Sequence, residues 1–181
     1  MLDTLLIDAT PRWLIGQAVA FLALALCIAG FANKDDNKLL LILIAANVAF
    51  AVQFALLGSW VSAGITCIVI TRIVLARRYH RNLFIMAALL AATIGVAVIG
   101  WQDWKDAPAL IAGILGTVGM FAFRGTIMRW WLFVAAFFWV LSNVAIGSLG
   151  GILAESLVMT TNIITIWRIE MDKRRLATTK I

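Results

Sequence analysis

A single carboxylate lies deep within a long apolar stretch of this sequence. Glu155 falls in residues 139–168, where most side chains are apolar. A charge exposed to lipid costs about 3 kcal/mol on insertion scales, so such a residue usually faces the interior of a helix bundle. In a helix, Glu155 would share one face with Gly151 and Asn162, which lie four residues before it and seven after it.

The preceding apolar run adds an aromatic and an amide side chain. Trp139 and Asn143 are four residues apart, so they would point to the same side of a helix. We expect Trp139 to stack on a flat or cyclic solute while Glu155 and Asn143 supply hydrogen bonds. A proton is then a candidate coupled ion, because intramembrane carboxyl groups serve in proton relays. The alternative is a protonated Glu155 that joins neighbouring helices, as polar residues in bundles do for about 0.6–2 kcal/mol.

Other polar residues in apolar runs have two interpretations. Asn47 and Gln17 are either cavity-lining residues or hydrogen-bonding partners between helices. Gln53 lies half a turn away from the Asn47 face, which favours helix packing. The sequence has no nucleophile motif, metal-ligand cluster, paired carboxylates or phosphate loop. We therefore predict that the protein is not an enzyme and needs no metal or cofactor.

The elements that position these residues must be transmembrane helices. Of the 181 residues, 64% are hydrophobic and 13% are charged, and the mean hydropathy is +1.01. Runs of about 17–20 apolar residues recur, the length at which a helix crosses about 30 Å of hydrocarbon. The net charge of +6 comes from basic residues in short segments between the runs, and not from one patch. We therefore expect a lipid bilayer, and no nucleic acid, as a partner.

The apolar runs and their breaks predict an all-α protein with seven spans. These are residues 13–31, 39–57, 59–76, 83–101, 108–123, 130–146 and 149–168. With the amino terminus outside, Lys and Arg residues divide thirteen to two in favour of the inner side, and Arg72 and Arg129 count among the thirteen. Because basic residues collect on the cytoplasmic side, we expect the amino terminus outside and the carboxyl terminus inside.

Two similar turns indicate an internal repeat. Gly58-Ser59 and Gly147-Ser148 are separated by 89 residues, and each would join two spans on the outer side. Three spans cross the membrane an odd number of times, so two such units share an orientation only if one helix separates them. The sequence predicts a 3+1+3 parallel repeat in a single transmembrane domain. Its parts are a first triple-helix bundle over 13–76, a linker helix over 83–101, a second bundle over 108–168 and a basic cytoplasmic tail over 169–181.

This arrangement and two stretches of sequence resemble known families. The 3+1+3 order with the amino terminus outside resembles the SWEET, SemiSWEET and PQ-loop transporters. The stretches "FALLGSWVSAGITCIVITRIVLARR" and "FFWVLSNVAIGSLGGILAESLVMTTNIITIWR" are similar to the YgjV-type bacterial inner membrane protein family. The resemblance covers nearly the whole chain, and it implies a bacterial cytoplasmic membrane.

The resemblance to the transporters implies a pocket with one residue pair from each bundle, sixteen positions apart. In this sequence the pairs are Phe50 with Thr66 and Trp139 with Glu155. The expected substrate-binding residues are thus Glu155, Trp139, Asn143, Asn162, Thr66, Phe50 and Asn47.

The implied function is a small-solute carrier that alternates access by rocking one bundle against the other. The alternative is a non-transporting receptor or scaffold that binds a peptide, a lipid or a partner membrane protein in the same cavity. The solute is not identified by the sequence, and a homo-oligomer is left open.

Overall fold

Seven α-helices make up the computed structural model, which describes residues 10–32, 36–79 and 81–178. They are α2 (Pro11–Ala32), α3 (Asp36–Leu56), α4 (Trp60–Arg78), α5 (Leu83–Gly100), α6 (Ala107–Ala122), α7 (Gly125–Ile146) and α8 (Leu149–Thr178). A 3-10 turn, η1 (Trp104–Asp106), precedes α6, and the described residues contain no strand. The prediction of an all-α protein is confirmed.

Five of the helices are long and apolar enough to cross a membrane, judged by length and composition. They are α2, α5, α6 together with η1, α7 and the part of α8 over Leu149–Asp172. Two further apolar stretches, Leu40–Leu56 in α3 and Trp60–Ala76 in α4, are shorter. Large apolar side chains point outward on the helices, with Val98 and Ile99 on α5 74% and 89% exposed. Such surfaces are compatible with lipid as the surrounding solvent.

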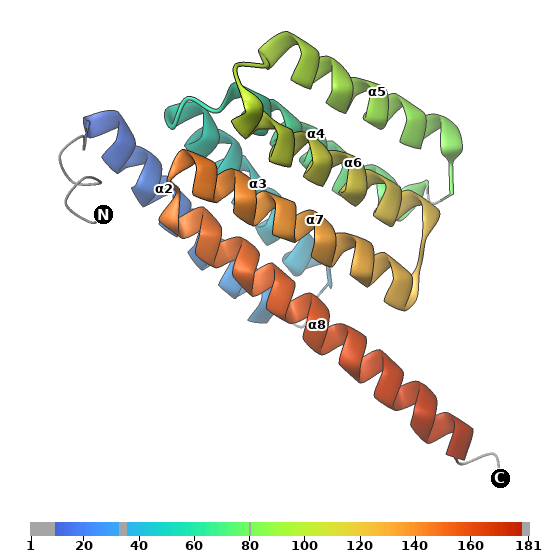
Figure 1. Ribbon diagram of the computed structural model, residues 1–181. Helices are drawn as coiled ribbons and strands as arrows, with labels where there is room; N and C mark the ends of the chain where they lie inside the picture. The colour runs from blue at the N-terminus through green and yellow to red at the C-terminus, as the bar shows by residue number, and fades with distance from the viewer. Residues whose placement is uncertain (1–9, 33–35, 80, 179–181) are drawn as a thin grey trace.

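Two helices extend beyond the predicted spans. α7 begins at Gly125 and not at residue 130, and α8 continues to Thr178 and not only to residue 168. Polar residues mark where a chain leaves hydrocarbon, but they do not by themselves end a helix. Residues 169–178 are rich in good helix formers, so α8 runs on past the other helices, as Figure 1 shows. The two extensions are joined by Thr126 Oγ1, which donates to Glu170 Oε1 at 3.0 Å.

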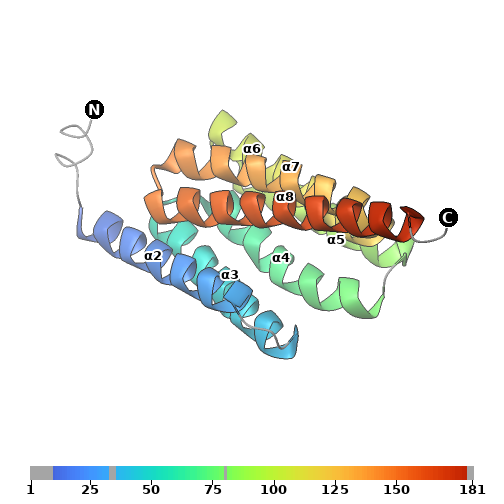
Figure 2. The same cartoon turned by 90° about the horizontal axis from the view of Figure 1, so that it is seen from below.

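Six helices form a ring, and α5 lies outside it. In the first triplet (α2, α3, α4), α3 packs between its neighbours, and in the second triplet (α6, α7, α8), α7 does the same. Contacts of α2 with α8 and of α4 with α6 close the ring, while α5 packs on α4 and α6. Figure 1 shows α5 at one edge of the molecule, and Figure 2 shows α2 and α3 side by side.

Both triplets turn between their second and third helices at a glycine. Gly58 has φ +81° and Gly147 has φ +71°, a left-handed conformation that costs other residues about 1–2 kcal/mol. In each turn the amide of the following serine donates to the carbonyl five residues earlier, at 2.9 Å in both cases. We call the end of the bundle that holds these turns the hinge end. The opposite end, where α4, α6 and α8 finish, is the basic end.

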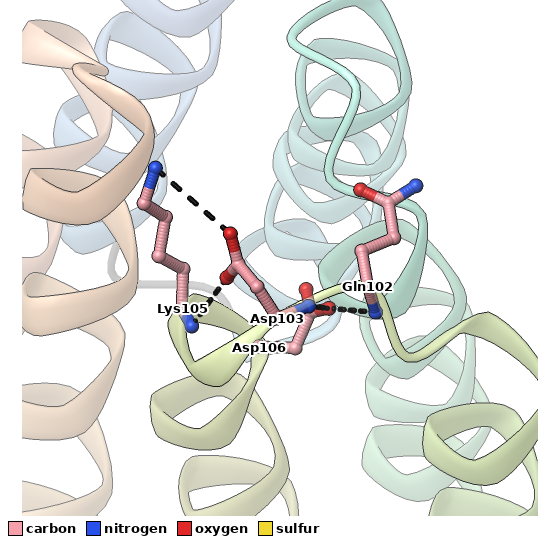
Figure 3. A network of polar contacts seen from close by, with 4 residues as sticks. All are labelled: Gln102, Asp103, Lys105 and Asp106. Atoms are coloured by element: carbon pink, nitrogen blue, oxygen red, sulfur yellow. Dashed lines mark hydrogen bonds and ion pairs between the residues drawn. The ribbon is translucent and has the colours of Figure 1, made fainter.

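A capped turn joins α5 to α6 at the hinge end (Figure 3). The Lys105 amide donates to Asp103 Oδ1 at 2.6 Å, and the Gln102 amide donates to Asp106 Oδ2 at 2.8 Å. Lys105 Nζ also lies 4.0 Å from Asp103 Oδ2. The positive charge of this lysine is therefore partly offset by a neighbouring acid.

Candidate functional site: a cavity between the two triplets

A cavity of about 240 Å³ is lined by residues of both triplets. A dry cavity of about 150 Å³ can hold benzene, so this one has room for a ring with a short polar substituent. Most of its lining is aliphatic or aromatic. The charged and amide side chains among its lining residues are Asn47, Arg72, Arg129, Glu155 and Asn162.

Six of the seven expected substrate-binding residues line this cavity, and Asn143 does not. The six are Phe50, Asn47, Thr66, Trp139, Glu155 and Asn162. The Asn143 side chain is only 2% exposed, and its Nδ2 donates to the Trp139 carbonyl at 2.9 Å. Its Oδ1 packs so closely on Gly151 that a Cβ there would collide with it. Asn143 therefore packs helix against helix and is not available to a solute in the cavity.

The two residue pairs lie at a common depth. Phe50, Thr66 and Glu155 are each six residues from the hinge-end terminus of their helix, and Trp139 is seven residues from its own. At about 1.5 Å per residue, all four lie about 9–11 Å from the hinge end. Each triplet thus contributes two lining residues at one level.

Aromatic rings form the hinge-side wall of the cavity. Phe54 of α3 and Trp139 of α7 stack with ring centroids 5.6 Å apart and an interplanar angle of 26°. Phe50 follows with its centroid 6.5 Å from that of Phe54. The stack joins the two triplets, and it offers a flat apolar surface to a bound ring.

Arg72 lines the cavity instead of the cytoplasmic border. It lies six residues before the end of α4 and is only 6% exposed. Its Nη1 donates to the Gly113 carbonyl of α6 at 3.3 Å, and its Nε has no hydrogen-bond partner. An unpaired N–H on a buried cation is costly unless an anion or water completes it. The charge count along the sequence misses this role, although Arg72 lies inside the predicted span 59–76, and that position is the signal that identifies it.

Glu155 adds an acidic side chain to the cavity lining from the second triplet. It is partly buried, and it interacts electrostatically with Arg72. Within the described residues its carboxylate forms neither a hydrogen bond nor an ion pair within 4.0 Å. The two charges come from different triplets, α4 and α8, so a small polar solute could lie between them.

A second arginine lies nearer the basic end. Arg129 Nη1 donates to Asn162 Oδ1 at 3.4 Å, and both residues line the cavity. Arg129 is seventeen residues from the hinge-end terminus of α7, or about 25 Å along the helix, whereas Arg72 is twelve residues from that of α4, or about 18 Å. The lining therefore changes from aromatic and acidic near the hinge end to basic further along. Among the described residues, no group of three His, Cys, Asp or Glu side chains could hold a metal ion.

Hydrogen bonds between the triplets close the hinge end. Gln53 of α3 is fully buried, and its Nε2 donates to Ser148 Oγ of the second turn at 2.9 Å. Ser62 Oγ of α4 and Ser142 Oγ of α7 form a hydrogen bond of 3.2 Å. Gln53, Ser62 and Ser142 lie within four residues of the hinge-end termini of their helices.

Gln17 adds a third link at the same end. Its Nε2 donates to the Gly147 carbonyl at 2.7 Å, and its Oε1 accepts from the Leu149 amide at 3.1 Å. Gln17 thus bridges the end of α7 and the start of α8, which matches the helix-joining interpretation. Asn47 lines the cavity, and its Nδ2 donates to the Leu43 carbonyl of its own helix at 2.8 Å.

The helices and the internal cavity define a multi-pass membrane protein with a chamber between two helix triplets. A family model described as "Bacterial inner membrane protein" and named Imp-YgjV matches residues 14–173. The chain is also 30% identical, over 168 residues, to "Inner membrane protein YgjV" of Escherichia coli (strain K12), an alignment that covers 91% of this chain and 90% of that relative. The chain therefore belongs to the YgjV family, and it is a multi-pass protein of the bacterial inner membrane. No solved structure matches it.

Proposed function

We propose that the protein is a small-solute carrier that alternates access to its cavity by rocking one triplet against the other. The observation that carries this proposal is that both triplets line the cavity while the hydrogen bonds that Gln53 and Ser62 form between them lie on its hinge side. A solute held between two bodies changes its access when the bodies tilt. The alternative, a receptor or scaffold, needs a cavity that opens to one side only.

We infer that the helices form a 3+1+3 parallel repeat, an arrangement suited to this mechanism. The contacts of the ring come in equivalent pairs, since α2 with α8 corresponds to α6 with α4. The turns at Gly58 and Gly147 have equal backbone hydrogen bonds at a separation of 89 residues. Two equivalent bodies joined by α5 can exchange roles between an inward-facing and an outward-facing state. With two parallel triplets separated by one linker helix, the chain would resemble the SWEET-type transporters.

We infer that the hinge end faces the outside of the cell. Arg78, Arg124 and Arg168 are exposed at the basic end, whereas Lys105 at the hinge end is paired with Asp103. Basic residues accumulate on the cytoplasmic side of inner membrane proteins. In this orientation the closed hinge end blocks the outside, and the cavity belongs to a cytoplasm-facing state.

Thiol accessibility tests the proposal. The variant Thr66→Cys, in a background with Cys27→Ala and Cys67→Ser, has one thiol at the depth of Glu155. A membrane-impermeant maleimide should label this thiol in inside-out vesicles and also in right-side-out vesicles. Labelling from both sides is expected because the two states exchange.

The matched control is the native thiol one residue further along. Cys67 is exposed on the outside of α4 and does not line the cavity. In the Cys27→Ala variant it should resist the reagent from both sides, since lipid covers it. Labelling of Thr66→Cys from the cytoplasmic side alone would contradict the carrier and favour the receptor.

A further inference from the structure

The charges of the cavity point to the chemical class of its solute. Resting on the proposed function, we propose that the cavity selects a small organic anion, a carboxylate on a compact ring, with Arg72 as its recognition residue. Three features of the described residues carry this inference: an incompletely paired guanidinium, an excess of positive charge, and an aromatic wall of matching size.

The guanidinium of Arg72, which lines the cavity, is packed against α6 with its hydrogen bonding incomplete. On the α6 side it packs against Gly116, where a Cβ would collide with it. Its Nη1 donates to a backbone carbonyl, and its buried Nε has no partner among the described residues. A guanidinium presents five donors in a planar fork that matches a carboxylate, so an anion would complete the pairing that the protein leaves unfinished.

The balance of charge in the lining also favours an anion. Arg72 and Arg129 contribute two positive charges, and Glu155 contributes the one negative charge among the lining residues. Such charges act strongly on one another in an apolar surrounding. A monoanionic solute would bring this excess of positive charge to balance, whereas a cation would increase it.

The remaining wall suits the body of such a solute. Phe50, Phe54 and Trp139 present ring surfaces at the hinge side of the cavity. The volume of about 240 Å³ exceeds what benzene needs and is below that of most drug-sized sites. A single ring with one carboxylate fits both the surface and the volume.

Glu155 is the residue that the incoming carboxylate replaces. It interacts electrostatically with Arg72 of α4 and Cys27 of α2, and Arg129 of α7 lines the same cavity. When a solute carboxylate takes over the interaction with Arg72, the Glu155 carboxylate loses its counter-charge.

Three probes of one shape but different charge test the inference. Benzoate is an anion, benzamide is neutral and benzamidine is a cation. In thermal-shift measurements on the full chain in detergent, benzoate should raise the melting temperature, whereas benzamide and benzamidine should not.

The Arg72→Gln variant should weaken benzoate binding by about ten- to hundredfold, the range for a lost charge-assisted hydrogen bond. Arg168→Gln, at an exposed position of α8 outside the cavity, should leave it unchanged.

A second variant covers the case in which Arg72→Gln does not fold. Gly116→Ala keeps the arginine but displaces its guanidinium, so it should also weaken benzoate binding. Gly119→Ala is the matched control, because a Cβ there meets Trp131 and not the cavity arginine. It should cost stability without changing the benzoate affinity.

Several results would overturn the inference. Among the probes, these are stronger stabilisation by benzamidine than by benzoate, equal stabilisation by all three, or no stabilisation by benzoate. Among the variants, it is benzoate binding that survives both Arg72→Gln and Gly116→Ala. Thiol accessibility of the Thr66→Cys variant needs no ligand. It therefore decides the carrier proposal separately, even where the anion inference fails.

Discussion

The chemistry of the cavity depends on a few charged residues that come from opposite triplets. Arg72 is nearly enclosed, and it shares its electrostatic environment with Glu155 on α8. Neither charge is completed by a close ion pair among the described residues. Each is therefore sensitive to any third charge that enters between them.

This coupling predicts that Glu155 weakens the binding of an anion. A carboxylate at this position competes with benzoate for Arg72, whereas an amide does not. The Glu155→Gln variant should therefore bind benzoate more tightly than the unmodified chain at the same pH. Titration calorimetry on the two proteins measures this, and equal affinities would contradict the role assigned to Glu155.

Residue spacing predicts one part of the cavity and misses another. The depth shared by Phe50, Thr66, Trp139 and Glu155 follows from helical rise once the turns are located, so sequence reasoning can reach it. The role of Arg72 cannot be reached by counting charges, because a basic residue near a span end has the same signature whether it faces water or a cavity. Its burial depends on Gly116 of another helix, which only packing reveals.

At the scale of helices, the two glycine turns are the best-defined feature of the fold. Each turn needs a left-handed residue, and each is followed by a serine whose hydroxyl takes part in the closed end. Long apolar runs predicted all seven helices, because a backbone in hydrocarbon must satisfy its hydrogen bonds internally. The ends of α7 and α8 were harder to predict, since helix propensity continues past the edge of the apolar run.

A cross-link between the triplets should stop the exchange between states. Ser62 Oγ and Ser142 Oγ are 3.2 Å apart and belong to different triplets. In the Cys27→Ala, Cys67→Ser background, the pair Ser62→Cys with Ser142→Cys should form a disulfide under oxidation. With Thr66→Cys also present, labelling from the outside should then be lost, while labelling from the cytoplasm continues.

A cross-link within one triplet provides the control. Ser59 Oγ donates to Ser62 Oγ at 2.7 Å, and both residues lie in the first triplet. The pair Ser59→Cys with Ser62→Cys should oxidise without changing the labelling from either side. Loss of outside labelling in this control would indicate that any change near the turn blocks access, and the assignment of the two moving bodies would be wrong.

For the molecule as a whole, the ring of six helices explains how a small protein can hold a cavity in a membrane. The triplets pack on one another mainly through their first and third helices, and α5 packs outside the ring on α4 and α6. The described cross-triplet links of Gln17, Gln53 and Ser62 gather at the hinge end. Motion of one triplet against the other therefore has to break these links on one side of the cavity and bring the helices together on the other.

Spin-label distances across both ends of one protein measure whether the two triplets rock against each other. Leu41 on α3 and Trp167 on α8 are exposed near the basic end, and Leu14 on α2 and Val144 on α7 are exposed near the hinge end. One cysteine pair at each end, in the background without native thiols, is spin-labelled. Pulsed electron–electron double resonance then gives the separation of the triplets at that end. Gln53→Leu removes a hydrogen bond of the closed end and should shift the population towards the other state.

With Gln53→Leu, the hinge-end distance should lengthen while the basic-end distance shortens. Opposite changes at the two ends are what rocking about a central cavity requires. Distances that stay the same at both ends, or that lengthen together, would contradict the account.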